Sequence, residues 1–165
     1  MDYNPAYCRI TQLRARKRRV ELPVLRAAGE ALPFRDSSFR AVTSMDVIEH
    51  VQIPERYLRE LGRVLAPGGR AVLTVVNRWA ARDPHYHLWG VNFLPGGARD
   101  AYVRLRGRAK EHGNAGEQEL SRMHYYRFSE FARLAERAGF RVHAPELGRK
   151  LRWLGAAWMF VLEKK

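Results

Sequence analysis

The residues best suited to chemistry lie in a short segment, 44–50, that ends in Ile48-Glu49-His50. This segment follows the run 40–45, which predicts a strand, so we expect it to form the loop at the carboxyl end of that strand. Ligands of open α/β sheets bind beyond the carboxyl ends of the strands. His50 is the candidate general base, because an imidazole titrates near neutral pH. A purely structural hydrogen bond is the alternative role of His50.

A second group of chemically capable side chains lies in the segment 82–95, which is rich in histidine and aromatic residues. A loop of this composition can form an amphipathic lid over a flat or apolar acceptor. We expect the His-Tyr-Tyr sequence at 124–126 to return to the same pocket. The candidate substrate-binding residues of this lid are His85, Tyr86, Trp89 and Phe93.

The histidines of these two segments raise the question of a metal site. His85, His87 and His124 are the ones that could converge. Zinc sites combine histidine with cysteine or carboxylate ligands at characteristic spacings. No cysteine pair or carboxylate accompanies these histidines at such a spacing, so the sequence predicts no metal ion.

The apolar patterns predict the elements that must position these side chains. The run 71–76 is apolar without alternation, the pattern of a parallel strand buried on both faces. In the first helix, Ala6, Ile10 and Leu13 follow at helical spacing and are expected to face the core. Strands are expected at 23–25, 40–45, 71–76, 140–144 and 157–162, and helices from Asn4-Pro5, from Pro54 to the Gly68-Gly69 stop, near 98–106, and from a Ser129 cap to Gly139.

The order of these elements predicts the fold class and the domain organisation. Strands that alternate with helices imply right-handed crossovers and a doubly wound parallel sheet. The length of 165 residues fits a single domain, 1–165. The segment 78–119 interrupts the alternation, so we interpret it as an inserted substrate-lid region within that domain.

The composition excludes several classes of protein. The single cysteine, Cys8, rules out an internal disulfide framework and fits a reducing compartment. We expect no signal peptide, no membrane span and a cytoplasmic location. The net charge of +13 invites a nucleic-acid interpretation. However, the arginines are spread over all predicted elements, and the dense run 14–19 lies at a predicted helix C-terminus, where cations complement the helix dipole. We therefore do not expect a nucleic-acid partner.

The central part of the chain resembles the class I S-adenosylmethionine-dependent methyltransferases of the type 11, small-molecule group. Several motifs carry this resemblance in the family's order and spacing. They are Glu30-Ala31-Leu32-Pro33-Phe34, Ser38-Phe39, Ile48-Glu49-His50, the helix over 54–64, and Leu65-Ala66-Pro67-Gly68-Gly69.

The resemblance implies S-adenosylmethionine as cofactor and assigns residues to it. Asp2 corresponds to the acidic residue that accepts from both ribose hydroxyls, although an acidic residue at a helix N-terminus is also favoured by the dipole alone. Tyr3 lies along the adenine, and the backbone of Gly29 and Glu30 meets the adenine edge. Met45 belongs to the loop beneath the sulfonium.

Two positions depart from the family pattern. Ala28 and Arg40 each stand where the family usually has aspartate. The change at Ala28 removes one contact to the adenine amino group, and Arg40 reverses a charge.

The resemblance also implies that part of the family's sheet lies upstream of this chain. The expected fold is α/β, a Rossmann-like methyltransferase sheet with flanking helices that lacks the first strand and its helix. The chain would then begin after the family's glycine-rich cofactor loop and would not contain it. This leaves the strand at 40–45 with one unpaired side, which a second copy of the chain or another edge-pairing partner could cover.

Three functions are compatible with these features. The first is methyl transfer to an oxygen, nitrogen or carbon of a small-molecule acceptor, with activity uncertain in a truncated chain. Such transfer can rest on positioning and desolvation, so it does not require His50 as a base. The second is a non-catalytic binding module with a degenerate methyltransferase fold, which Ala28 and Arg40 favour. The third, RNA methylation, rests on charge alone.

Overall fold

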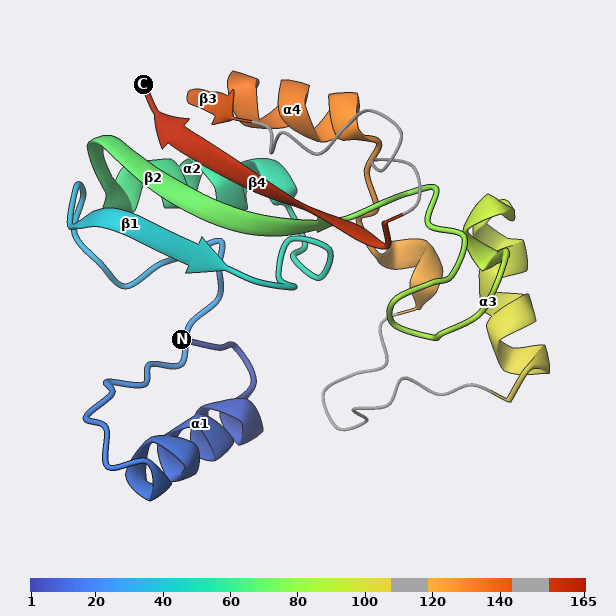
Figure 1. The fold of residues 1–165 in the computed structure, drawn as a ribbon, viewed down its shortest axis with the longest axis horizontal. Coiled ribbons are helices and arrows are strands. Elements are labelled where there is room, and N and C mark those ends of the chain that lie inside the picture. The colour runs from blue at the N-terminus through green and yellow to red at the C-terminus, as the bar shows by residue number, and fades with distance from the viewer. Residues whose placement is uncertain (108–118, 144–154) are drawn as a thin grey trace.

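The computed structural model describes residues 1–107, 119–143 and 155–165, and the elements form one α/β unit (Figure 1). The predicted α/β class is thereby confirmed. The elements in chain order are α1 (Pro5–Lys17), β1 (Phe39–Ser44), α2 (Pro54–Val64), β2 (Leu65–Val76), a 3₁₀ turn (Val91–Phe93), α3 (Gly96–Leu105), a second 3₁₀ turn (Leu120–Arg122), α4 (Phe128–Arg137), β3 (Phe140–His143) and β4 (Ala157–Lys164). The predicted lid region 78–119 lies within the described part except for residues 108–118.

The sheet has four strands in the order β1-β2-β4-β3. β1 runs parallel to β2, as predicted, with Val42 opposite Ala71. β4 lies antiparallel to both β2 and β3, so the prediction of a purely parallel sheet is wrong at this strand. Antiparallel neighbours need no crossover helix between them, unlike parallel ones.

The main core lies on one face of this sheet. Its buried side chains come from α2, α4, β2 and β4 and include Leu58, Phe131, Leu73 and Phe160. Along β2 the burial alternates: Ala71, Leu73 and Val75 are fully buried, whereas Val72 and Thr74 are half-buried. The prediction that 71–76 is buried on both faces is therefore wrong. Both helices that contribute to this core contact the same face of the sheet (Figure 1).

Strand β1 lies at an edge of the described sheet. It pairs with β2 on one side, and its residues Arg40, Ala41 and Thr43 are exposed. This agrees with the expectation of an unpaired side at this strand. An exposed strand edge presents unpaired N–H and C=O groups and can pair with another chain.

Helix α1 begins where the sequence predicts, but its apolar face is not buried. Asn4 caps the helix by accepting a hydrogen bond from the Ala6 N–H. The expectation that Ala6, Ile10 and Leu13 face the core is wrong, because all three are exposed. Figure 1 shows the reason: α1 lies apart from the sheet. Cys8 is its one buried residue, and its thiol approaches the Asp2 carbonyl.

Three local predictions also need correction. The segment 23–25 forms no strand, and a single bridge between Asp2 and Arg26 replaces it, because the residues around it are largely exposed and no strand of the described part lies beside them. Ser129 does not cap α4, since the helix begins one residue earlier and the Glu130 carboxylate accepts from the Arg127 N–H. Helix α2 ends at Val64, before the glycine pair, which lies instead in a bulge of β2.

Candidate active site

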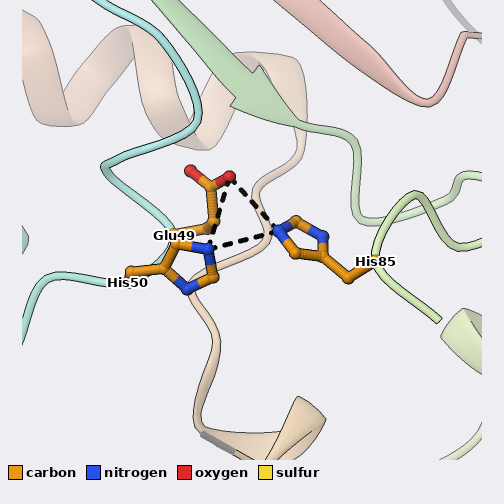
Figure 2. Close-up of side chains that lie close together, drawn as sticks. All are labelled: Glu49, His50 and His85. Atoms are coloured by element: carbon orange, nitrogen blue, oxygen red, sulfur yellow. Dashed lines mark hydrogen bonds and ion pairs between the residues drawn. The ribbon is translucent and has the colours of Figure 1, made fainter. Parts of the chain in front are cut away.

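The candidate site is built where β1 and β2 end. The chain leaves β1 at Ser44 and turns through Glu49 and His50, while the segment that follows β2 brings His85 to the same place. Figure 2 shows the three side chains pointing toward one another. The parallel pairing of β1 and β2 explains this, because their carboxyl ends lie at the same edge of the sheet.

The reactive atoms of these three residues are close together. Nε2 of His85 lies 3.3 Å from Nε2 of His50 and 3.5 Å from Oε1 of Glu49. Nε2 of His50 lies 4.0 Å from the same carboxylate oxygen. The Glu49 side chain is fully buried, whereas the His50 side chain is 31% exposed, so the cluster opens to solvent on the His50 side.

A second set of residues forms hydrogen bonds on the other ring nitrogen of His85, Nδ1. The Tyr125 hydroxyl lies 2.8 Å from Oδ2 of Asp83 and 3.1 Å from Nδ1 of His85. Burial, and next the Asp83 carboxylate, raises the pKa of Tyr125, so its hydroxyl keeps its proton. A hydroxyl has one proton to donate, and the carboxylate is its stronger acceptor. The Tyr125 oxygen therefore accepts from Nδ1–H of His85, which leaves the lone pair of Nε2 directed at the cluster.

The backbone fixes both loops in this arrangement. The Asp83 carboxylate caps the turn that carries His85, accepting from the N–H groups of His85 and Tyr86 at 2.9 and 2.7 Å. The His124 N–H donates to the Glu49 carbonyl at 3.0 Å, and Tyr126 forms a bridge with Asn77 at the end of β2. The expectation that 124–126 returns to the site is thus confirmed for Tyr125.

The first two cofactor candidates lie at the start of the chain. The Asp2 carboxylate accepts from the Asn4 N–H through Oδ1, and Oδ2 makes no hydrogen bond within the part of the chain that the structure describes. Tyr3 is 69% exposed, and its ring lies beneath the Arg26 guanidinium. The bridge from Asp2 to Arg26 brings both residues next to the loop that carries Gly29 and Glu30.

The other cofactor candidates come from two loops. Glu30 is held by its carboxylate, which accepts from the Gln52 N–H, and by its carbonyl, which accepts from Nε of Arg56. Met45 follows β1 and is half-exposed. A free carboxylate oxygen on Asp2, an accessible aromatic ring on Tyr3 and an exposed thioether on Met45 fit a nucleoside with a thioether tail.

Gly29 packs so closely that it tolerates no side chain. A Cβ at this position would lie 2.7 Å from a ring carbon of Tyr57, whose hydroxyl makes a short hydrogen bond with Ser44. We expect Gly29→Ala to destabilise the protein by about 1–3 kcal/mol, because the buried ring must move.

Gly62 provides the matched control in helix α2. A Cβ there would meet only ordinary contacts, the nearest at 3.5 Å. Gly62→Ala should therefore stabilise the protein by about 0.5–1 kcal/mol through helix propensity. Urea unfolding of both variants measures the two effects, and equal shifts of the same sign would contradict the packing argument.

The structure separates the four predicted substrate-binding residues. His85 lies in the cluster, and Tyr86 is buried in a second core cluster with Leu88 and Val91. Trp89 and Phe93 are exposed, and Phe93 stacks on Trp79. Within the described residues, no hydrogen bond or ring contact joins Trp89 or Phe93 to the cluster.

Sequence reasoning missed two members of the site, Glu49 and Asp83, and gave Tyr125 a place near the pocket but no specific role. Glu49 precedes His50 in the loop after β1. The histidines expected to be the metal candidates were His85, His87 and His124, but the residues that the structure brings together are Glu49, His50 and His85. The carboxylate that the sequence analysis found lacking is thus supplied by Glu49.

The comparisons with known proteins agree with this architecture. Residues 1–73 match a family model described as a methyltransferase domain. An uncharacterized methyltransferase of Mycobacterium sp. strain JLS is 40% identical over 85 residues, which cover 50% of this chain and 33% of the relative. A demethylmenaquinone methyltransferase of Thermus thermophilus is 42% identical over 72 residues, 44% of this chain and 33% of that protein.

A solved structure supports the fold over nearly the whole chain. It is a SAM-dependent methyltransferase from Thermotoga maritima, described as a possible histamine N-methyltransferase. Its TM-score is 0.58 at 23% identity, and the match covers 95% of this chain and 70% of that one. At this identity the likeness shows the fold.

The match over residues 1–73 shows similarity to a methyltransferase domain, and the fold is of the Rossmann-like type found in the solved methyltransferase structure. Residues 1–73, less than half of the chain, are the part similar to this family, and the motifs there resemble those of the class I S-adenosylmethionine-dependent methyltransferases. Its match spans one third of the length of the two curated relatives. Among the described residues, no helix is both long and apolar enough to cross a membrane.

Proposed function

We propose that this chain takes part in the transfer of a methyl group from S-adenosylmethionine to a small-molecule acceptor. The observation that carries the proposal is the pair of imidazoles, His50 and His85, held beside a buried carboxylate at the carboxyl ends of β1 and β2. When bound, S-adenosylmethionine supplies an electrophilic methyl group on a sulfonium. The chain must then hold an acceptor and accommodate the proton that it loses.

His50 is the residue that we assign to proton transfer. Its imidazole lies at the exposed side of the cluster, and its Nε2 is within hydrogen-bond distance of Nε2 of His85. A proton that reaches either ring can be shared between them and is stabilised by Glu49. An acceptor that ionises, such as a hydroxyl, gains most from this arrangement.

The acceptor class is suggested by exposed aromatic side chains on the segment that carries His85 and by one relative. Trp89 and Phe93 present exposed aromatic rings on the segment that also carries His85. One curated relative is a demethylmenaquinone methyltransferase. Both features support a flat aromatic acceptor with an ionisable hydroxyl, and we assign Trp89 and Phe93 to its binding, with His85 at the reacting end. Tyr86 supports this segment from the second core cluster.

The cofactor would lie along the residues at the start of the chain and the two neighbouring loops. Asp2 would accept from the ribose hydroxyls through its free Oδ2, and Tyr3 would lie against the adenine. The backbone of Gly29 and Glu30 would meet the adenine edge, with Met45 near the methionine half.

Calorimetric titration with S-adenosylhomocysteine tests this assignment. We expect micromolar binding by the wild-type chain and at least 10-fold weaker binding by Asp2→Asn, which keeps the bond to Asn4 but removes the charge. Glu21→Gln is the matched control, because it removes a charge from an exposed position that is not among the assigned site residues. Equal affinities for Asp2→Asn and the wild type would refute the role of Asp2.

The alternative function is a binding module without catalysis. The exposed Arg40 and the open edge of β1 favour it, because an edge strand can pair with a partner chain. A second copy of this chain is one such partner. Absence of S-adenosylhomocysteine binding by the wild-type chain would favour this alternative.

A further inference from the structure

We propose that Glu49, His50 and His85 bind a divalent transition-metal ion, and that Zn²⁺ is the ion that their chemistry favours. Two imidazole nitrogens and one carboxylate oxygen are a ligand set that catalytic zinc sites use. These three ligand atoms lie within 4.8 Å of one another (Figure 2). The ion site stands on this geometry alone and does not require that the chain transfers methyl groups.

The distances suit a tetrahedral ion. Bonds of about 2.0–2.2 Å at tetrahedral angles place neighbouring ligand atoms roughly 3.3–3.6 Å apart. The distances from Nε2 of His85 are 3.3 Å to Nε2 of His50 and 3.5 Å to Oε1 of Glu49. The third separation, 4.0 Å between His50 and Glu49, closes with a small movement of the more exposed His50 ring.

The cluster lacks the positive charge that its buried carboxylate requires. Both oxygens of the Glu49 carboxylate are buried without a hydrogen-bond partner, and no lysine or arginine of the described residues forms an ion pair with it. A buried, unpaired carboxylate is unfavourable by several kcal/mol. A cation at the point where the three side chains meet removes this penalty.

The tautomer of His85 also leaves Nε2 able to bind a metal ion rather than to donate a hydrogen bond. Because Nδ1–H of His85 donates to Tyr125, the Nε2 lone pair faces the Glu49 oxygen, an arrangement that is repulsive without a cation between them. Metal-bound histidines characteristically donate their other ring N–H to an oxygen that is itself hydrogen-bonded. Tyr125 and Asp83 form such a second layer around His85.

The ion would keep an open coordination position. Three protein ligands leave a fourth site for water or for an oxygen of a bound molecule. His50 is the most exposed of the three, so this position faces solvent on its side. If the proposed methyl transfer is correct, an acceptor hydroxyl at this position would ionise more readily, because a bound zinc ion lowers the pKa of an oxygen ligand.

The test is metal binding by the intact chain, prepared without a polyhistidine tag and freed of metal by a chelator. Zn²⁺ is titrated calorimetrically, and Co²⁺ is added separately to record the absorption bands of a tetrahedral ion. We expect one ion per chain with micromolar or tighter affinity. Tyr125→Phe should weaken binding by about 10–100-fold as a second-layer change, and Glu49→Gln and His85→Ala should weaken it further.

His143→Ala is the matched control. His143 also faces a carboxylate, Glu163, at 3.1 Å, but this pair lies on the surface of the sheet away from the cluster. Its loss should leave Zn²⁺ affinity unchanged. The proposal is overturned if the wild type binds no Zn²⁺, or if Glu49→Gln and His85→Ala bind it as the wild type does. Because no cofactor or acceptor is present, these outcomes are independent of whether methyl transfer is found.

Discussion

Replacing His50 with alanine is expected to lower kcat for methyl transfer by about 100-fold or more. The imidazole lies at the open side of the cluster, and in our proposals it would take the acceptor's proton or hold the ion that ionises the acceptor. Either role acts on the reacting oxygen, whereas the assigned cofactor residues other than Met45 lie on other segments of the chain. The affinity for S-adenosylhomocysteine should therefore stay within about 2-fold of the wild type.

The measurement is the release of S-adenosylhomocysteine with a panel of small phenols and hydroquinones as acceptors. His143→Ala serves again as the control, since it removes an imidazole from β3 without contact with the cluster. A kcat for His50→Ala equal to that of the wild type would assign His50 the structural role instead. A parallel loss of cofactor affinity would show that the variant disturbs the whole site.

The helices were predictable where local signals and tertiary packing agree. In α2, Pro54 gives the start, and the stripe of Tyr57, Leu58 and Leu61 gives the buried face. In α1 the cap at Asn4 gives the start, but the apolar spacing does not give burial. Burial depends on whether another element packs against the helix, and periodicity carries no information about that.

The direction of a strand was less predictable than its existence. Hydropathy locates β4, yet Trp158 and Phe160 can be buried whether the strand runs parallel or antiparallel to β2. The same limit explains why the prediction that β2 is buried on both faces was wrong. An apolar run indicates that both faces tolerate apolar residues, while the helices of the described part cover one face.

The candidate site was half predictable. His50 and His85 were each singled out because histidines on loops at strand ends suit chemistry, but they are far apart in sequence and nothing local pairs them. Glu49 was overlooked because its significance comes from complete burial, which a polar loop sequence does not suggest. The site emerges only when β1 and β2 place their ends side by side.

Glu49→Gln should stabilise the metal-free protein, by about 1–3 kcal/mol, while it abolishes the proposed ion site. The substitution keeps the shape of the side chain and removes a buried charge whose two oxygens have no hydrogen-bond partner. The new amide can also donate to the Nε2 lone pair of His85, which lies 3.5 Å from Oε1 in the wild type. A residue that is retained against stability is typical of a functional site.

Urea unfolding with and without Zn²⁺ measures both halves of this prediction. At a free Zn²⁺ concentration of about 100 times Kd, the wild type should gain about 2.7 kcal/mol, whereas Glu49→Gln should gain little. Glu49→Gln would then be the more stable protein without Zn²⁺, and the wild type would be the more stable protein with it. If Glu49→Gln is instead less stable than the wild type without metal, the Glu49 charge is already balanced in the metal-free protein, and the argument for the ion site fails. The order of the two proteins in the absence of Zn²⁺ therefore decides whether Glu49 needs a metal ion.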